Sequence, residues 1–226
     1  MLQTLLGRRI YTNLKNAIRF VISIHIPIIL IVFIPLILGW KFPNIFSPIH
    51  IIFLELIMGP TCSIIYENEP METNQMEIKP RPFTSTFLSW RELLLSITQG
   101  LIIAVGTLII YQYSVKNNYT QALTRTMVFA TLITANIFLT LVNRSSFYSF
   151  FTTLRYKNNL LKYIILATIV ITAILFYFKP VKNFFEFETL NALQLCIAIS
   201  IGLISVIWYE FLKWIKRKRA TSNIKN

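Results

Sequence analysis

The sequence contains no aspartate, only two cysteines and little charge, and each shortage excludes a class of protein. All nine acidic residues are glutamates, so no mechanism that needs an aspartyl side chain can operate on this chain alone, which also lacks a P-loop. Cys62 and Cys196 lie in apolar stretches without metal-site spacing, which argues against a disulfide or a zinc site. With 14% charged residues, 55% hydrophobic residues and a mean hydropathy of +0.60, the chain is too apolar for a soluble domain.

Long apolar runs are abundant. A helix needs about 20 apolar residues to cross the hydrocarbon core of a bilayer, where lipid cannot satisfy exposed backbone groups. The runs therefore predict an all-α fold, a polytopic membrane bundle of six transmembrane helices. The expected spans are 20–40, 48–66, 93–113, 123–142, 160–178 and 192–212.

The basic residues predict the orientation of this bundle. We interpret the net charge of +13 as topological and expect no nucleic-acid partner. Most of the 22 lysines and arginines lie in segments that six crossings place on the side of both termini. Both termini are therefore expected in the cytoplasm, with the chain as a multi-pass protein of the plasma (inner) membrane. The expected parts are a lead-in helix at 1–19, a first helix pair at 20–66, a cytoplasmic link at 67–92, a four-helix membrane region at 93–212 and a basic tail at 213–226.

The second expected span carries both a carboxyl group and a helix breaker. Glu55 lies well inside this span, where an ionised side chain costs about 2.5–3.5 kcal/mol, so a functional role is the first hypothesis. Pro60 has no N–H for the carbonyl group of Leu56, and Gly59 permits the backbone angles of a local unwinding. A carboxylate beside freed carbonyl oxygens suits calcium, magnesium or an alkali cation. Broken helices at this depth recur in ion transporters.

Each polar group in the spans also has a structural interpretation. Glu55 is equally well explained as a protonated carboxyl group that is hydrogen-bonded to a neighbouring helix. His25, in the first span, is a candidate ligand, although a packed and hydrogen-bonded histidine is commoner. Gly100 and Gly106 are expected to allow close helix packing. Further polar groups that either complete the site or link helices are Ser23, Thr131, Thr134 and Asn136.

Eight stretches, in order along the chain, resemble the C-terminal membrane part of a P-type cation-transporting ATPase. They are GRRIYTNLKNAIRF (Gly7–Phe20), HIPI (His25–Ile28), PIHIIFLELI (Pro48–Ile57), PTCSIIYENEP (Pro60–Pro70), KPRP (Lys79–Pro82), TRTMVFATLITANIFLTLVNRS (Thr124–Ser145), YKNNLL (Tyr156–Leu161) and WYEFLKWIKR (Trp208–Arg217). The resemblance covers almost the whole chain and is nearest to a bacterial, calcium-ATPase-like branch. It implies that the six spans are helices five to ten of a ten-helix transporter.

This resemblance implies a cation site around Glu55. Glu55 takes a ligand position of the family's sixth helix, and His25 falls where the fifth helix of calcium pumps commonly has a ligating asparagine. Two positions depart from the pattern, because Ile28 replaces a glutamate and Gly59 replaces the aspartate that usually precedes the helix-breaking proline. The implied metal site comprises Glu55, His25, the backbone carbonyl of Leu56, and Gly59. The implied transported ligand is a cation such as Ca²⁺, and no cofactor is expected in this chain.

Three functions remain open. The family phosphorylates an aspartate in an Asp-Lys-Thr-Gly motif, which this chain lacks, so it is not catalytic alone. The first hypothesis is the membrane part of a cation pump, inserted in the lipid bilayer and acting with a separate chain that carries the catalytic half. The second is a degenerate remnant without transport, favoured by Ile28 and Gly59. The third is a non-enzymatic membrane protein that binds a partner or conducts ions, with the acidic link Glu67–Glu77 as a docking surface, although such a run is more often a solvated loop.

Overall fold

The computed structural model describes residues 2–60, 64–70, 87–156 and 158–225, and in this part of the chain the regular secondary structure is entirely helical. The first helix runs unbroken through the expected lead-in segment and the first span, and the last helix continues into the expected tail. The helices are α1 (Leu2–Ile37), α2 (Pro48–Pro60), α3 (Trp90–Lys116), α4 (Gln121–Asn143), α5 (Phe150–Leu154), α6 (Asn159–Tyr177), α7 (Lys179–Phe184) and α8 (Ala192–Lys225).

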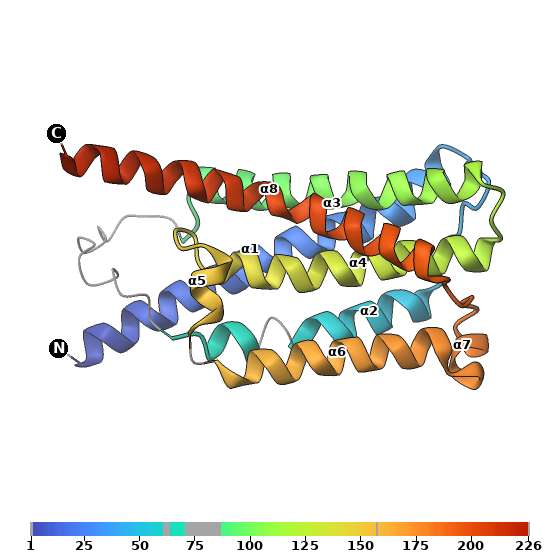
Figure 1. Cartoon of the computed structure of the whole chain (residues 1–226), viewed down its shortest axis with the longest axis horizontal. Helices are drawn as coiled ribbons and strands as arrows, with labels where there is room; N and C mark the ends of the chain where they lie inside the picture. Colours follow the sequence, from blue (N-terminus) through green and yellow to red (C-terminus); the bar gives the residue numbers. More distant parts are fainter. Residues whose placement is uncertain (1, 61–63, 71–86, 157, 226) are drawn as a thin grey trace.

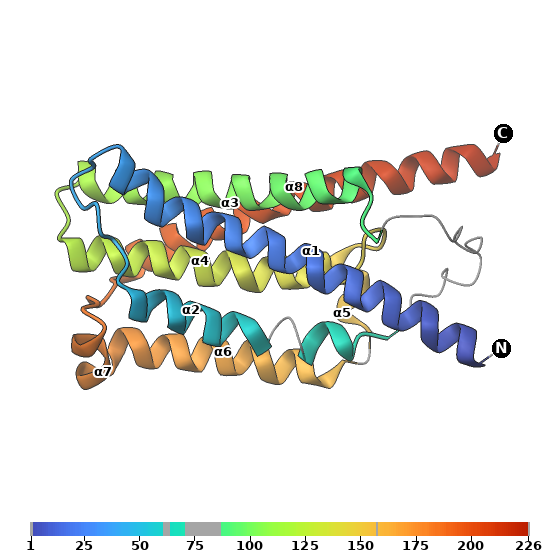
Figure 2. The same cartoon turned by 180° about the vertical axis from the view of Figure 1, so that it is seen from behind.

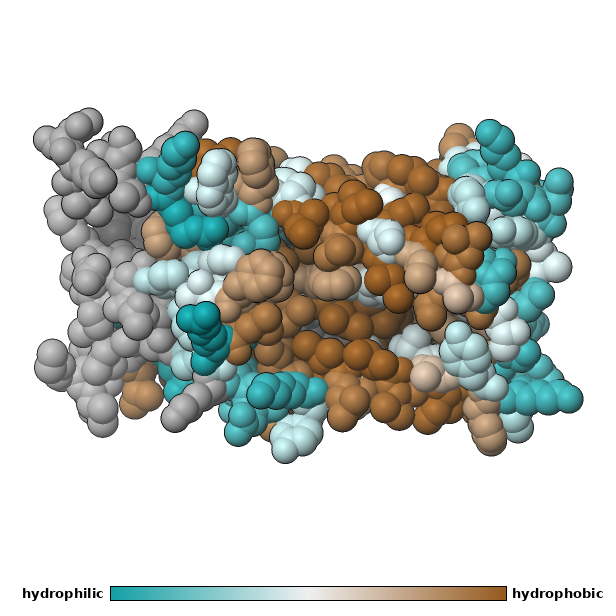
Figure 3. Space-filling view, viewed as in Figure 1, coloured by the Kyte–Doolittle hydropathy of each residue, from teal (hydrophilic) through white to brown (hydrophobic). Residues whose placement is uncertain are grey.

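Five helices are long and apolar enough to cross a membrane: α1, α3, α4, α6 and α8. They form one elongated bundle with both chain termini at the same end (Figure 1). We call this end the terminal end and the opposite one the distal end. On the face shown in Figure 3, a broad apolar band lies between two polar ends, as expected for a protein that crosses a bilayer. The predicted polytopic helical membrane bundle is confirmed.

The structure describes the second expected span, 48–66, on either side of residues 61–63. α2 has 13 residues and ends at Pro60, and the chain is helical again over residues 64–67. Residues 61–63, which include Cys62, lie outside the described part. α2 runs beside α6 in both views of the bundle (Figures 1 and 2). The close helix pairs are α4 with α8, α1 with α3, and α3 with α4, and α2 is not among them. The backbone of the helix that carries Glu55 therefore does not approach another helix as closely as those of α1, α3, α4 and α8 do.

Two glycines allow the closest helix contacts. A Cβ atom added at Gly100 of α3 would lie 2.8 Å from Ile26 Cβ and 2.9 Å from the Ser23 carbonyl oxygen, both on α1. One added at Gly202 of α8 would lie 2.9 Å from Thr134 Cβ on α4. Small residues at such crossings let helix backbones approach and pack in a membrane. Gly100 has the packing role that its sequence position predicts.

Gly100→Ala is expected to lower the free energy of unfolding by about 1–3 kcal/mol, because its methyl group forces α1 and α3 apart. The control is Gly7→Ala, at an exposed position of α1 where an added Cβ atom meets nothing within 4 Å. That change should be neutral or stabilising by up to about 1 kcal/mol, because alanine is the better helix former. Unfolding in mixed detergent micelles measures both, and equal stability of the two variants would contradict the packing assignment.

Candidate cation site

The structure brings His25 of α1 and Glu55 of α2 together. His25 Nε2 lies 3.3 Å from Glu55 Oε1. The other ring nitrogen of His25, Nδ1, lies 2.7 Å from the carbonyl oxygen of Val21 one turn earlier. A carbonyl oxygen only accepts hydrogen bonds, so Nδ1 carries a proton and Nε2 is the atom presented to Glu55. An imidazole and a carboxyl group from two helices therefore face each other across the first helix pair, at positions 30 residues apart in the sequence.

This pair lies at the surface of the bundle. The His25 side chain is 42% exposed and the Glu55 side chain is 41% exposed. Neighbouring apolar side chains on the same two helices are more open still, with Ile52 at 67%, Leu56 at 64% and Ile29 at 51%. Ionisable groups inside a membrane normally face protein or a water-filled cavity, because exposure to lipid is costly. The pair is therefore more exposed than is usual for ionisable groups within a membrane.

The last described residues of α2 lie one turn beyond Glu55. α2 ends at Pro60, which has no N–H to offer the Leu56 carbonyl oxygen. The side of Gly59 on which a Cβ atom would stand is open, with nothing within 4 Å. No cluster of three or more His, Cys, Asp or Glu side chains occurs in the described ranges. Among the described residues, two side chains and the backbone at the end of α2 are thus available to a cation at this position.

The structure does not bring the other polar candidates to the pair. Ser23 is buried against α3, where its hydroxyl lies 3.0 Å from the Ser96 carbonyl oxygen. Thr131 bonds back to the Met127 carbonyl oxygen within its own helix, at 2.9 Å. Ile28, at the position of a family glutamate, is a buried core residue. Of the polar candidates named here, Ser23 links α1 to α3, which is the structural interpretation that the sequence also allowed, and Thr131 is satisfied within α4.

A buried ion pair at the terminal end was not predicted. Glu69, in the segment after α2, is 3% exposed and accepts hydrogen bonds from Arg144 Nε at 2.9 and 3.0 Å. Arg144 Nη2 lies 2.7 Å from Glu69 Oε1, in ion-pair contact without hydrogen-bond alignment. Asn158 at the start of α6 donates to Glu69 Oε2 at 3.0 Å, and Asn13 of α1 donates to the Glu69 carbonyl oxygen at 2.9 Å. The expectation of a solvated or docking segment is wrong for Glu69, while Glu72 and Glu77 lie outside the described residues.

A second buried charge belongs to the expected basic tail. The Lys213 side chain is fully buried, and its Nζ donates to the Val142 carbonyl oxygen at 2.7 Å and to the Tyr148 carbonyl oxygen at 3.2 Å. Glu210, one turn earlier on α8, lies 2.5 Å from the same Nζ. Lys213 therefore holds the connection between α4 and α5 against α8. Its position in a run of basic residues gave no signal of this role.

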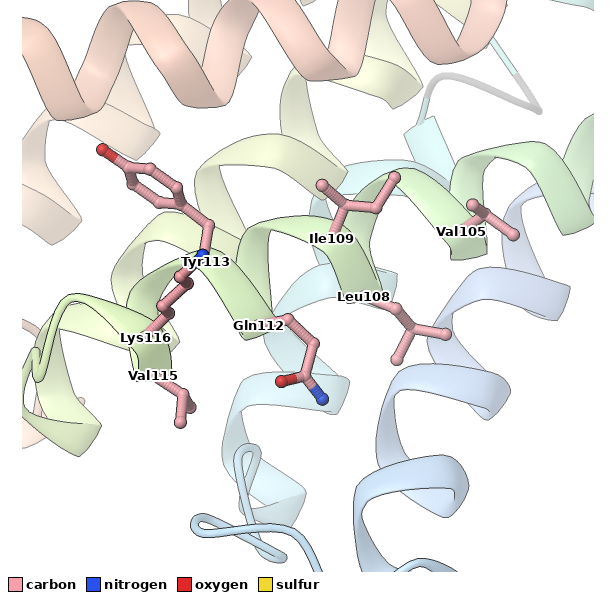
Figure 4. A pocket seen from close by; sticks show the side chains of 7 residues that line it. All are labelled: Val105, Leu108, Ile109, Gln112, Tyr113, Val115 and Lys116. Carbon is pink, nitrogen blue, oxygen red and sulfur yellow. The ribbon is translucent and has the colours of Figure 1, made fainter.

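Two surface hollows lie away from the pair. One, of about 670 Å³, is lined entirely by α3 residues, including Val105, Ile109 and Lys116 (Figure 4). Its walls are mainly apolar and its position on one helix suits contact with lipid chains. The other, of about 610 Å³, lies along the first turns of α1 beside Arg9 and Glu67. Neither hollow includes His25 or Glu55, so the candidate cation site rests on the facing side chains and not on a cavity.

The apolar belt, the crossing helices and the paired charges define a multi-pass helical membrane protein with ionisable groups inside its bundle. The chain belongs to the family described as cation transporting ATPase, C-terminus, which matches residues 43–215. This confirms the resemblance to the C-terminal membrane part of a P-type cation ATPase. The bacterial branch within that family stays a prediction.

Curated relatives agree with this assignment. The chain is 26% identical over 214 residues to calcium-transporting ATPase type 2C member 1 of Homo sapiens, covering 94% of this chain and 23% of that protein. It is 25% identical over 223 residues to calcium-transporting ATPase 1 of Yarrowia lipolytica, covering 97% of this chain and 24% of the relative. The chain thus spans about a quarter of the length of the relatives that it matches.

Proposed function

We propose that this chain is the membrane-embedded cation-translocating part of a P-type ATPase, with a calcium-like divalent cation held between α1 and α2. The observation that carries this proposal is the facing of His25 and Glu55, 3.3 Å apart, beside the end of α2 at Pro60. A carboxylate and nearby carbonyl oxygens are hard ligands that suit calcium and manganese, and the imidazole adds one nitrogen ligand. The backbone carbonyl of Leu56 and the open side of Gly59 complete the proposed site.

The partial exposure of the pair supports a site that is shared with other helices. His25 and Glu55 are each about two-fifths exposed on a surface of apolar neighbours. Calcium takes six to eight oxygen ligands, more than two side chains and a broken turn supply. The relatives are about four times as long as this chain and are named as calcium-transporting. We infer that the missing ligands come from membrane helices outside residues 1–226, on the same or a separate chain.

The length of α1 supports a mechanical role. Its 36 residues extend about 54 Å at 1.5 Å per residue, so it reaches well beyond the hydrocarbon core at the terminal end. Arg9 and Asn13 on this extension both donate to the Glu69 carbonyl oxygen. One rigid helix thus joins the His25 position to the terminal end. We place that end in the cytoplasm of a plasma (inner) membrane protein, where a catalytic half that hydrolyses ATP acts on α1.

A second candidate function is a membrane remnant that no longer transports. The observation that favours it is the loss of two expected acids, since Ile28 is buried in the apolar core and Gly59 carries no side chain. A site with one carboxylate binds a divalent cation weakly, because affinity rises with the number of charged ligands. The two candidates differ in whether the present site binds a cation at all.

Gly59→Asp is expected to raise the affinity for Ca²⁺ by about 10-fold or more, equivalent to about 1.4 kcal/mol. The new carboxylate stands four residues after Glu55, a spacing that places both groups on one helix face, about 5–6 Å apart at Cβ. Nothing lies within 4 Å of the position that its Cβ atom takes, so the change fits without repacking. Equilibrium binding of radioactive Ca²⁺ to the purified chain measures the effect.

The control for this gain is Gly59→Asn, which has the same shape without the charge. It should leave the affinity within a few-fold of that of the unaltered chain. An equal gain in both variants would point to a change of helix geometry. No gain in Gly59→Asp would contradict a cation site at the end of α2.

A further inference from the structure

The distal end of α2 is fixed by one buried side chain. His50, in the first turn of α2, is 1% exposed. Its Nε2 lies 2.7 Å from the carbonyl oxygen of Phe185, in the segment that follows α7. Its Nδ1 lies 3.1 Å from the backbone nitrogen of Ser47 and 2.7 Å from the Ser47 hydroxyl oxygen. His50 therefore links the start of α2 to a segment 135 residues away in the sequence.

These partners determine which nitrogen carries the proton. The Ser47 backbone N–H can only donate, so Nδ1 is the acceptor. The Phe185 carbonyl oxygen can only accept, so Nε2 is the donor. Both nitrogens of the neutral ring are thus satisfied. Adding a proton at Nδ1 turns the acceptor into a donor that points at the Ser47 backbone N–H, so that bond is lost, and the Ser47 hydroxyl oxygen must turn from donor to acceptor.

The surroundings of the ring also oppose a positive charge. The rings of Phe46, Phe185 and Phe187 lie around the His50 ring at centroid distances of 5.8, 6.0 and 5.2 Å. The charged groups that face His50 are Arg125 of α4 and Glu186 of the segment after α7. These two are already paired, with Arg125 Nη1 2.6 Å from Glu186 Oε2. A protonated His50 therefore faces the positively charged guanidinium group of Arg125 and the carboxylate of Glu186, which is already paired with Arg125.

The position of this contact matters because α2 is not closely packed against other helices. Glu69 fixes the chain beyond the terminal end of α2, and His50 fixes its distal end. Between the two lies Glu55, five residues after His50. A shift of the distal end of α2 thus changes the position of Glu55 against His25.

We propose that His50 is a positioning residue that holds α2, and with it Glu55, in place only while its ring is neutral. Protonation from the distal side breaks the bond from the Ser47 N–H and places a positive charge among the aromatic rings and beside Arg125, which loosens the packing of the first turn of α2. The consequence for cation binding rests on the proposed function, whereas the contact and its proton dependence do not. The distal side of the membrane is then the side whose acidity controls the geometry of the site.

The test is the thermal unfolding midpoint of the purified chain between pH 8 and pH 5. The midpoint of the unaltered chain should fall by about 2–4 °C as the pH drops through the ordinary histidine range near 6.5, since about one hydrogen bond is lost. His50→Gln retains a donor towards Phe185 and His50→Asn retains an acceptor towards Ser47, and neither titrates. Both should unfold at lower temperature than the unaltered chain at pH 8, with midpoints that change much less on acidification.

The matched control is His25→Gln, which removes the other of the two histidines. It should retain the full fall in the midpoint on acidification. An equal fall in His50→Gln and the unaltered chain, or no fall in the unaltered chain, would overturn the proposal.

A separate measurement of Ca²⁺ binding at pH 8 and pH 5.5 distinguishes failure of this inference from failure of the proposed function. Ca²⁺ binding that weakens about 10-fold at pH 5.5 in the unaltered chain but not in His50→Gln supports both the positioning role of His50 and the cation site. A His50-dependent midpoint without any Ca²⁺ binding supports the contact and contradicts the cation site. Ca²⁺ binding with a midpoint that does not depend on His50 supports the site and overturns the positioning role.

Discussion

Arg144→Ala is expected to lower the free energy of unfolding by about 3–5 kcal/mol, because it leaves a buried carboxylate without its countercharge. The Arg144 side chain is fully buried, and the Glu69 side chain is 4% exposed. Glu69 retains Asn158 as a donor in this variant, but one amide does not replace a guanidinium group. Unfolding in mixed detergent micelles gives the difference in free energy.

The control for this loss is Arg155→Ala, the same change at an exposed arginine eleven residues further on. It should change the stability by no more than about 0.5 kcal/mol. In the double variant Glu69→Ala, Arg144→Ala the free energy of unfolding should fall by less than the sum of the falls in the two single variants, because no unpaired charge is left behind. A loss for Arg144→Ala as small as that for Arg155→Ala would show that the buried pair is not a support of the fold.

The Glu69–Arg144 pair also connects several parts of the bundle. The Glu69 side chain joins the segment after α2 to the end of α4 and the start of α6, and its backbone carbonyl is bound by Arg9 and Asn13 of α1. Four parts of the bundle therefore meet at one residue, Glu69, at the terminal end. In the proposed function, these contacts and the His25–Glu55 contact are the points at which α1 acts on α2, and His50 holds the opposite end of α2.

The long helices were predictable because their signal is local. A run of about 20 apolar residues identifies a membrane helix without knowledge of its neighbours. Glu55 and His25 were found in the same way, as ionisable residues within apolar runs. Their facing across two helices was implied by family resemblance, and the structure places them 3.3 Å apart.

The buried charges at the terminal end were not predictable for the same physical reason. Glu69 and Arg144 are 75 residues apart, and each lies among polar residues at the end of a span, where exposure is the normal state. Lys213 is hidden in a basic run whose other members fit an orientation signal. The packing of α1, α4, α6 and α8 determines which of these charged side chains is buried. The periodicity of the sequence does not predict that packing.

Glu55→Gln is expected to weaken divalent cation binding by on the order of 100-fold, because it removes the sole carboxylate at the end of α2 among the described residues. The amide has the size of the carboxyl group and can still approach His25 Nε2, so insertion and helix packing should be retained. The unaltered chain and the variant should therefore unfold at similar temperatures while differing in binding. The control is Glu67→Gln, which removes one negative charge from an exposed residue outside the pair.

The binding isotherm of Mn²⁺, followed through the paramagnetic resonance signal of the free ion, tests the central claim most directly. Three purified chains are compared: the unaltered chain, Glu55→Gln and Glu67→Gln. A cation site at His25 and Glu55 predicts saturable binding that Ca²⁺ displaces in the unaltered chain and in Glu67→Gln, and its loss in Glu55→Gln. The same isotherm in the unaltered chain and Glu55→Gln, or no saturable binding in the unaltered chain, would contradict it.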